Sequence, residues 1–157
     1  MRRLPPRPRV LLADDHDRLR QALHDLLTES GFEIVGESGD GADAVALARL
    51  HEPDIVVIDL RMPVLNGLDA TRLIKDARPA TQVVVLSAFE SQELERQALD
   101  AGAYAYLDKG ALARRLYRVL LGAAVLAVLA ANAAAAGPSP AAASRGPGRP
   151  PRSWRRS

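Results

Sequence analysis

The chain has 157 residues, which is enough for one domain of ordinary size with some length to spare. It contains no cysteine, which excludes disulfide frameworks, cysteine-ligated zinc, iron–sulfur clusters and thiol catalysis. All 19 acidic residues lie between Asp14 and Asp108, whereas nine of the 21 lysines and arginines lie in the first nine and last thirteen positions. This distribution predicts an acidic folded body between two basic arms.

The first eight residues are basic and contain three prolines, so residues 1–8 are predicted to form a disordered arm. They lack the apolar stretch of about 7–15 residues that a secretory signal needs, so a cytoplasmic protein is expected. Residues 9–122 are predicted to form the folded domain.

Three short apolar runs predict strands, at residues 10–13, 55–58 and 83–86. Each run is aliphatic throughout, without alternation, which is typical of strands buried on both faces of a parallel sheet. Two weaker candidates, at 32–35 and 103–107, are predicted to lie nearer the sheet edges.

The segments between these strands carry apolar residues at helical spacing. Helices are predicted over residues 19–27, 42–50, 70–77, 91–101 and 112–123. Strand and helix therefore alternate five times. This alternation predicts a doubly wound α/β fold, in which right-handed crossovers place five helices around a five-stranded parallel sheet.

The character of the chain changes beyond residue 122. Residues 123–136 are rich in alanine and predict a helical extension. The apolar run at 119–131 ends at Asn132 and is shorter than the roughly 20 residues of a membrane span, so a packed or interfacial helix is expected rather than a span. Residues 137–157 contain mostly Pro, Gly, Ala, Ser and Arg without apolar periodicity, and a disordered tail is predicted.

Polar side chains follow the predicted strands where each strand ends. Asp14 and Asp15 follow the first strand, and Asp59 follows the strand at 55–58. Ser87 and Lys109 follow the last two strands. In an open α/β sheet, ligands bind outside the carboxyl ends of the strands. The sequence therefore predicts that three carboxylates, a hydroxyl and an ammonium meet at one edge.

Each of these residues has an ordinary structural explanation by itself. A carboxylate or serine after a strand often caps the next helix, and a lone lysine there is often solvated. Together, however, the carboxylates of Asp14, Asp15 and Asp59 would repel one another unless a cation lay among them. Oxygen ligands without cysteine or histidine favour Mg²⁺, which pairs with phosphate. Lys109 and Ser87 would then contact phosphoryl oxygens.

Four groups of residues at these strand ends resemble the receiver domains of two-component response regulators. In chain order they are Asp14-Asp15, Asp59-Leu60-Arg61-Met62-Pro63 with Asn66-Gly67, Ser87-Ala88, and residues 101–109. Their order and their positions at strand ends make the match specific. The resemblance covers roughly residues 8–122. It implies a flavodoxin-like fold whose five parallel strands are arranged in the order 2-1-3-4-5.

The resemblance also implies a regulatory phosphoprotein and not an enzyme. Asp59 would accept a phosphoryl group from a phosphohistidine on a sensor histidine kinase or a phosphotransfer protein. The side chains of Asp15 and Asp59 and the backbone carbonyl of Arg61 would bind Mg²⁺ directly. Asp14 would act through a metal-bound water.

The remaining site residues would transmit the signal. By resemblance, Lys109 and Ser87 would hold the phosphoryl oxygens. Movement of Ser87 toward the phosphoryl group, coupled to inward rotation of Tyr106, would reshape the face formed by helix 91–101, strand 103–107 and helix 112–123. A homodimer could form through that face. Taken alone, Tyr106 would be read as an ordinary packing residue.

Two forms of output remain open. Gly110, where many family members have proline, resembles the branch whose receivers precede a helix-turn-helix domain. Such a domain needs roughly 60 further residues with three helical patterns, and the 21 residues after Ala136 contain none. The chain is therefore either a stand-alone receiver or a DNA-binding transcriptional regulator whose output domain is truncated or replaced by the basic tail.

Two further functions find little support. Residues 145–152 faintly resemble minor-groove-binding peptides but lack their Arg-Gly-Arg-Pro core, so at most a weak contact of the tail with nucleic acid is expected. Phosphatases of the haloacid dehalogenase type also use an aspartate after a strand, with a second aspartate two residues later as general acid. Here that position is Arg61, which cannot donate a proton at neutral pH.

Overall fold

The computed structural model describes residues 6–137. The predicted tail at 137–157 therefore falls almost entirely outside the described residues, and the predicted arm at 1–8 falls largely outside them. All five predicted strands and all five predicted helices lie within the described part of the chain.

Five parallel strands form one sheet in the order β2-β1-β3-β4-β5, which confirms the predicted fold class. The strands are β1 (Arg9–Ala13), β2 (Glu33–Ser38), β3 (Ile55–Asp59), β4 (Gln82–Ser87) and β5 (Ala105–Asp108). The helices are α1 (Asp17–Glu29), α2 (Gly41–His51), α3 (Gly67–Ala77), α4 (Gln92–Asp100) and α5 (Leu112–Ala135), and the short 3₁₀ helix η1 (Lys109–Ala111) precedes α5.

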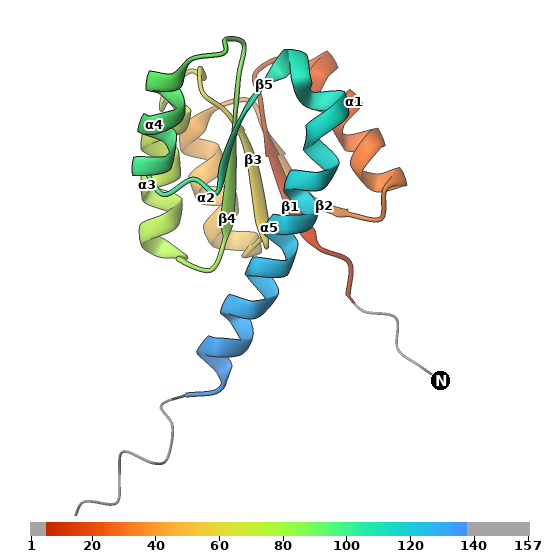
Figure 1. The fold of residues 1–157 in the computed structure, drawn as a ribbon, viewed down its shortest axis with the longest axis vertical. Coiled ribbons are helices and arrows are strands. Elements are labelled where there is room, and N and C mark those ends of the chain that lie inside the picture. Colours follow the sequence, from red (N-terminus) through yellow and green to blue (C-terminus); the bar gives the residue numbers. More distant parts are fainter. Residues whose placement is uncertain (1–5, 138–157) are drawn as a thin grey trace, which may run out of the picture.

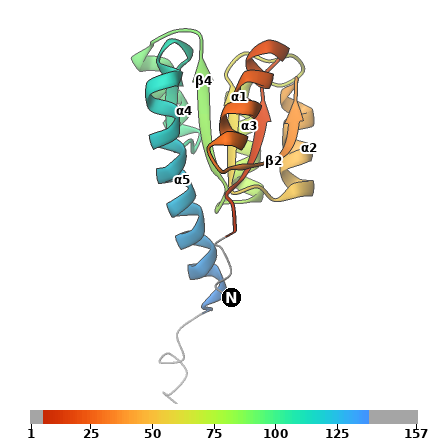
Figure 2. The same ribbon diagram turned by 90° about the vertical axis from the view of Figure 1, so that its right-hand side faces the viewer.

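Helices cover both faces of the sheet, as Figures 1 and 2 show. Alternate residues of the central strands therefore enter two separate cores. The core between the sheet and helices α1 and α5 includes Val10, Leu12, Leu27, Val57, Val84, Leu86, Leu116 and Leu120. The core under α2, α3 and α4 includes Leu11, Ala44, Val45, Val56, Ile58, Ile74, Val83, Val85 and Ala98. Burial on both faces explains why these strands lack an alternating pattern.

Three of the helices begin at side chains that cap them. Asp40, Asn66 and Ser91 each accept a hydrogen bond from the backbone N–H three residues later, at the start of α2, α3 and α4. These caps satisfy backbone donors that a helix cannot satisfy itself, and they fix where each helix leaves the strand-end loop.

The edge strand β2 extends to Ser38, three residues beyond its predicted end at Val35. It pairs only with β1, and its register shifts between Val10 and Leu11 of that strand. Most of its residues are partly exposed, so no apolar run marks its second half. The hydrophobic pattern alone therefore ends this strand too early.

Helix α5 is continuous from Leu112 to Ala135, so the predicted extension at 123–136 begins inside this helix. Asn132, which ends the apolar run, lies within the helix. The C-terminal half of α5 projects beyond the end of the sheet (Figures 1 and 2). By length and composition alone, Arg114–Ala135 could cross a membrane. This is weak evidence for a span, because Leu116 and Leu120 of the same helix are buried against the sheet.

Candidate functional site

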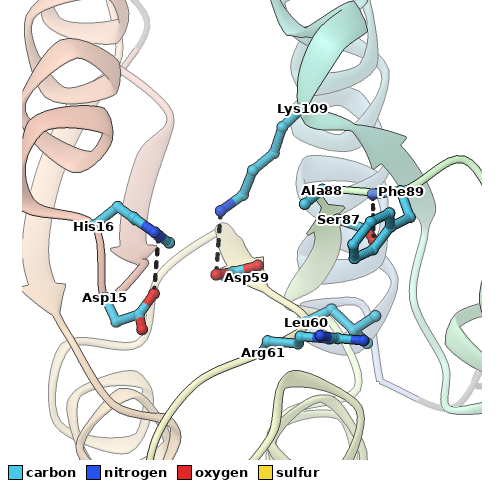
Figure 3. A pocket seen from close by; sticks show the side chains of 9 residues that line it. All are labelled: Asp15, His16, Asp59, Leu60, Arg61, Ser87, Ala88, Phe89 and Lys109. Carbon is cyan, nitrogen blue, oxygen red and sulfur yellow. Dashed lines mark hydrogen bonds and ion pairs between the residues drawn. The ribbon is translucent and has the colours of Figure 1, made fainter.

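The predicted site residues gather at the carboxyl edge of the sheet. Asp14 and Asp15 follow β1, Asp59 ends β3, Ser87 ends β4, and Lys109 follows β5. They surround a pocket of about 250 Å³, shown in Figure 3. The residues that line this pocket are Asp15, His16, Asp59, Leu60, Arg61, Ser87, Ala88, Phe89 and Lys109. Asp14 lies beneath it and is 2% exposed.

Lys109 joins the two buried carboxylates. Its Nζ lies 2.9 Å from Oδ2 of Asp14 and 3.1 Å from Oδ2 of Asp59. Oδ2 of Asp14 is buried without a hydrogen-bond partner, so its contact with Lys109 is an ion pair without hydrogen-bond geometry. One ammonium thus balances two carboxylates that would otherwise repel each other.

His16 belongs to the same cluster, although the sequence pattern does not single it out. Its Nδ1 lies 3.1 Å from Oδ1 of Asp15 and 3.3 Å from Oδ1 of Asp14, and its backbone N–H donates to Asp14 over 2.8 Å. The ring is largely exposed, unlike Asp14. The only sequence feature that could indicate this role of His16 is its position next to Asp15. No second histidine lies at the spacing of a metal-binding pair, so the histidine pattern does not indicate it.

The position of Asp59 follows from close packing behind it. β3 is buried along its whole length, and the backbone N–H of Gly67 donates to the carbonyl oxygen of Leu60 over 2.8 Å. A Cβ at Gly67 would collide with the carbonyl oxygen of Asp59. Glycine therefore allows α3 to start directly against the end of β3, while Asn66 caps that helix.

The surroundings of the site shift the pKa values of its charged groups. Burial, followed by the negative charge of Asp14, raises the pKa of Asp59 above its ordinary value of 3.8, and contact with Lys109 offsets only part of this effect. Burial by itself would lower the pKa of Lys109, but Asp14 and Asp59 outweigh it and raise that pKa above 10.5. Lys109 is therefore charged at neutral pH. Burial and the neighbouring charge of Asp14 disfavour the charged form of Asp59.

The raised pKa of Asp59 predicts that the stability of the folded protein depends on pH. Because the pKa of Asp59 is raised on folding, its charged form opposes folding, and stability falls as the pH rises from about 4 through the raised pKa. We expect Asp59→Asn to raise the free energy of unfolding of the metal-free protein at neutral pH by on the order of 1 kcal/mol. The melting temperature should rise accordingly, by roughly 4 °C. The gain should shrink toward pH 4. Thermal melts of both proteins from pH 4 to 8 measure it, and a gain that grows on acidification would contradict it.

Ser87 and Tyr106 are linked through the backbone of Phe89. The N–H of Phe89 donates to the hydroxyl of Ser87 over 3.1 Å, and the hydroxyl of Tyr106 donates to the carbonyl oxygen of Phe89 over 2.6 Å. Tyr106 is buried and thus already occupies the inward position that is predicted to follow phosphorylation. Phe89 lies two residues after Ser87, but no sequence pattern indicates that it joins the two.

Arg61 lines the pocket with its side chain. Its guanidinium carbon lies 5.3 Å from the centre of the Phe89 ring, within cation–π range. The resemblance to receiver domains implies only a backbone role for Arg61. Both side chains line the pocket, on the side of Asp59 away from Asp15 and His16 (Figure 3).

The acidic cluster has the composition and geometry of a site for a hard divalent cation. One ligand atom each from Asp14, Asp15, His16 and Asp59 lies within 4.8 Å of the others. The buried Asp14 oxygen that lacks a hydrogen-bond partner is a donor that such a cation could use. Carboxylate oxygens are preferred by Mg²⁺ and Ca²⁺, so the donor set fits a cation of this kind.

Comparison with known proteins agrees with the fold. Residues 10–121 match the family described as response regulator receiver domain. The transcriptional regulatory protein PdtaR of Mycobacterium tuberculosis is 50% identical over 101 residues, which cover 64% of this chain and 49% of PdtaR. The chemotaxis protein CheY of Thermotoga maritima is 38% identical over 101 residues, which cover 64% of this chain and 84% of CheY.

A solved structure gives the same result. The signal receiver domain of the putative response regulator NarL from Mycobacterium tuberculosis superposes with a TM-score of 0.72 and 30% identity, covering 76% of this chain and 98% of that one. The chain therefore belongs to the receiver domain family of two-component response regulators. The matched region is about half the length of PdtaR.

Proposed function

We propose that this receiver domain accepts a phosphoryl group on Asp59 from a phosphohistidine of a sensor histidine kinase or a phosphotransfer protein. The observation that carries the proposal is the contact of Lys109 with two buried carboxylates, Asp59, which lines an open pocket, and Asp14, which lies beneath it. This arrangement supplies a carboxylate nucleophile and a positive charge for the incoming phosphoryl oxygens. In this role the domain is a regulatory acceptor and not an enzyme.

The transfer is an in-line displacement. A carboxylate oxygen of Asp59 forms a bond to phosphorus while the bond from phosphorus to the imidazole nitrogen of the partner breaks, and the imidazole leaves with the electron pair. Negative charge develops on the phosphoryl oxygens, where the Lys109 ammonium can contact them. Ser87, at the end of the neighbouring strand, offers a hydroxyl donor. These groups act mainly by positioning and charge neutralisation.

We assign Mg²⁺ to the acidic cluster. Asp15 and Asp59 would hold it directly together with the carbonyl of Arg61, and Asp14 would hold it through water. When bound, Mg²⁺ would neutralise charge on the carboxylates and on the phosphoryl oxygens. Lys109 would then be released from its contact with Asp14 and could turn toward the phosphoryl group.

Metal binding should be visible in the stability of the unphosphorylated protein. We expect millimolar Mg²⁺ to raise the melting temperature, because a ligand that binds only the folded state stabilises it, by about 2.7 kcal/mol at a hundred times its dissociation constant. Asp15→Asn should reduce the response at least severalfold, whereas the exposed Asp76→Asn should leave it unchanged. A wild-type melting temperature that does not respond to Mg²⁺ would contradict the assignment.

The link through Phe89 suggests how the signal leaves the site. If the hydroxyl of Ser87 turns toward a phosphoryl oxygen, it loses the N–H of Phe89, and the loop between β4 and α4 moves. Tyr106 holds the carbonyl of the same residue, so this movement changes the surface of α4, β5 and α5. We propose this face for contacts with an output partner and for a homodimer.

The decisive test of the proposal is phosphorylation of the full chain by acetyl phosphate, a small donor that needs no partner. With Mg²⁺, we expect one phosphoryl group per chain, with the hydroxylamine sensitivity of an acyl phosphate. Without Mg²⁺, the reaction should stop. Phosphorylation at full rate in the presence of a chelator, or a hydroxylamine-resistant product, would refute the proposal.

The cytoplasm is the proposed place of action, because sensor kinases present their phosphohistidines there. A weak contact between nucleic acid and residues 137–157 stays a prediction, since these residues lie almost wholly outside the described part of the chain. Within residues 6–137, the structure gives no observation that favours DNA binding over phosphorylation control.

A further inference from the structure

The projecting half of α5 carries an exposed apolar stripe. Leu121, Val125, Val128 and Leu129 are 43%, 59%, 56% and 57% exposed. We call these residues, together with the exposed Asn132, the outer stripe. Figures 1 and 2 show this half of α5 away from the other described helices and strands. A contiguous apolar patch left open on a folded protein is typical of an interaction surface.

The outer stripe lies on the side of α5 that faces away from the protein body. The buried residues of the helix recur every three or four positions and point to the opposite side: Leu116, Leu120, Ala123 and Ala127. At 100° per residue, the centres of the two sets are nearly half a turn apart. The outer stripe and the buried residues therefore form two separate faces of α5.

The spacing of the stripe is that of a two-stranded coiled coil. Leu121, Val125, Val128 and Asn132 are separated by four, three and four residues, which places them at heptad positions d, a, d and a. A β-branched residue at a favours two strands, and a single asparagine at a selects a parallel, in-register pair. Ala124, Val125, Val128 and Leu129 also line a shallow apolar hollow, a recess suited to a side chain of a facing helix.

The charge of the helix restricts what can cover the stripe. No charged residue occurs between Val119 and Ala136, so the occupant must itself be apolar there. The segments outside the described residues offer only Met1, Leu4 and Trp154 as large apolar side chains, fewer than the four apolar residues of the stripe. A second copy of the chain presents a matching uncharged stripe, whereas Asn132 within the stripe disfavours burial in a bilayer.

We propose that the projecting halves of α5 from two copies of this chain pair in parallel from Leu121 to Ala135, with the two Asn132 side chains hydrogen-bonded to each other. Arg114 and Arg118, exposed at the preceding d and a positions, face their counterparts and confine the pair to the projecting half. The pair spans about two heptads, so the dimer is weak, concentration-dependent and strengthened by salt, which screens these arginines. This surface is distinct from the face of α4, β5 and α5 and does not depend on phosphorylation.

The first test is sedimentation of the full chain over a wide concentration range. We expect a monomer–dimer equilibrium that Val125→Glu with Val128→Glu weakens at least about tenfold, because each charge would be buried unpaired in the pair. Both residues are exposed in the monomer, so its fold and melting temperature should persist. Ala133→Glu with Ala134→Glu adds the same charge at exposed positions off the stripe and should dimerise like the wild type.

The second test uses the absence of cysteine from the natural chain. Under mild oxidation, Asn132→Cys should form a disulfide-linked dimer, because residues at position a of a parallel pair face each other within disulfide reach. Ala134→Cys, on the exposed opposite side, should not become disulfide-linked, although it can still pair without a covalent bond. Equal cross-linking of both variants, a wild type that stays monomeric at every concentration, or a dimer that the double glutamate variant leaves intact would each overturn the proposal. Flotation of a monomeric chain with phosphatidylglycerol–phosphatidylethanolamine vesicles would likewise overturn it and make a bilayer the occupant.

Discussion

Asparagine at position 59 is expected to abolish phosphorylation by acetyl phosphate, with a loss in rate of at least about 10³-fold. The amide has nearly the shape of the carboxylate but lacks the negative oxygen that attacks phosphorus. Within residues 6–137, no other carboxylate is both buried and part of the pocket lining. Asp14 is equally buried but lies beneath the pocket, and Asp15 is partly exposed.

The same variant separates chemistry from folding. Asp59→Asn is expected to stabilise the metal-free protein at neutral pH, so lost phosphorylation cannot be attributed to unfolding. Asp76→Asn, an exposed change on α3 remote from the pocket, should be phosphorylated like the wild type. The measurement is intact mass after incubation with acetyl phosphate and Mg²⁺, followed by hydroxylamine treatment. Undiminished phosphorylation of Asp59→Asn would show that another residue is the phosphoryl acceptor.

The sheet, and the acidic residues that meet at its carboxyl edge, can be predicted from the sequence for physical reasons. β1, β3 and β4 are buried on both faces, so their aliphatic runs stand out without alternation. Parallel strands end at one edge, so the residues that follow them must converge. The strand pattern by itself therefore predicts that Asp14, Asp59 and Lys109 lie close together.

Other features depend on three-dimensional contacts that no local pattern encodes. His16 joins the acidic cluster through its ring orientation. The link from Ser87 to Tyr106 runs through the backbone of Phe89, whose hydrogen-bond groups are the same in every residue type except proline.

Removing the ammonium of Lys109 should have two effects with different responses to Mg²⁺. Lys109→Met keeps most of the aliphatic stem but loses the charge that would contact a phosphoryl oxygen, so phosphorylation should slow by about 10²-fold. It also leaves Asp14 and Asp59 facing each other without their counter-charge. Breaking a buried ion pair costs about 3–5 kcal/mol, and protonation of Asp59, whose pKa is already raised, should reduce this cost as the pH falls.

Magnesium distinguishes these two roles of Lys109. A divalent cation among the carboxylates replaces the lost counter-charge, so Mg²⁺ should restore much of the melting temperature of Lys109→Met. It cannot replace the ammonium at the phosphoryl oxygens, so phosphorylation should stay slow at saturating Mg²⁺. Lys75, the only other lysine in the sequence, provides the matched control. Its Nζ donates to the carbonyl oxygens of Pro79 and Thr81.

Because Lys75 lies outside the pocket, Lys75→Met should lower stability independently of Mg²⁺ and leave the rate of phosphorylation unchanged. Melting temperatures and phosphorylation rates of the three proteins, measured with Mg²⁺ and with a chelator, test both roles together. If Mg²⁺ restored the rate of Lys109→Met as fully as its stability, the ammonium would serve only as a counter-charge in the metal-free site. Its assigned contact with the phosphoryl group would then be wrong.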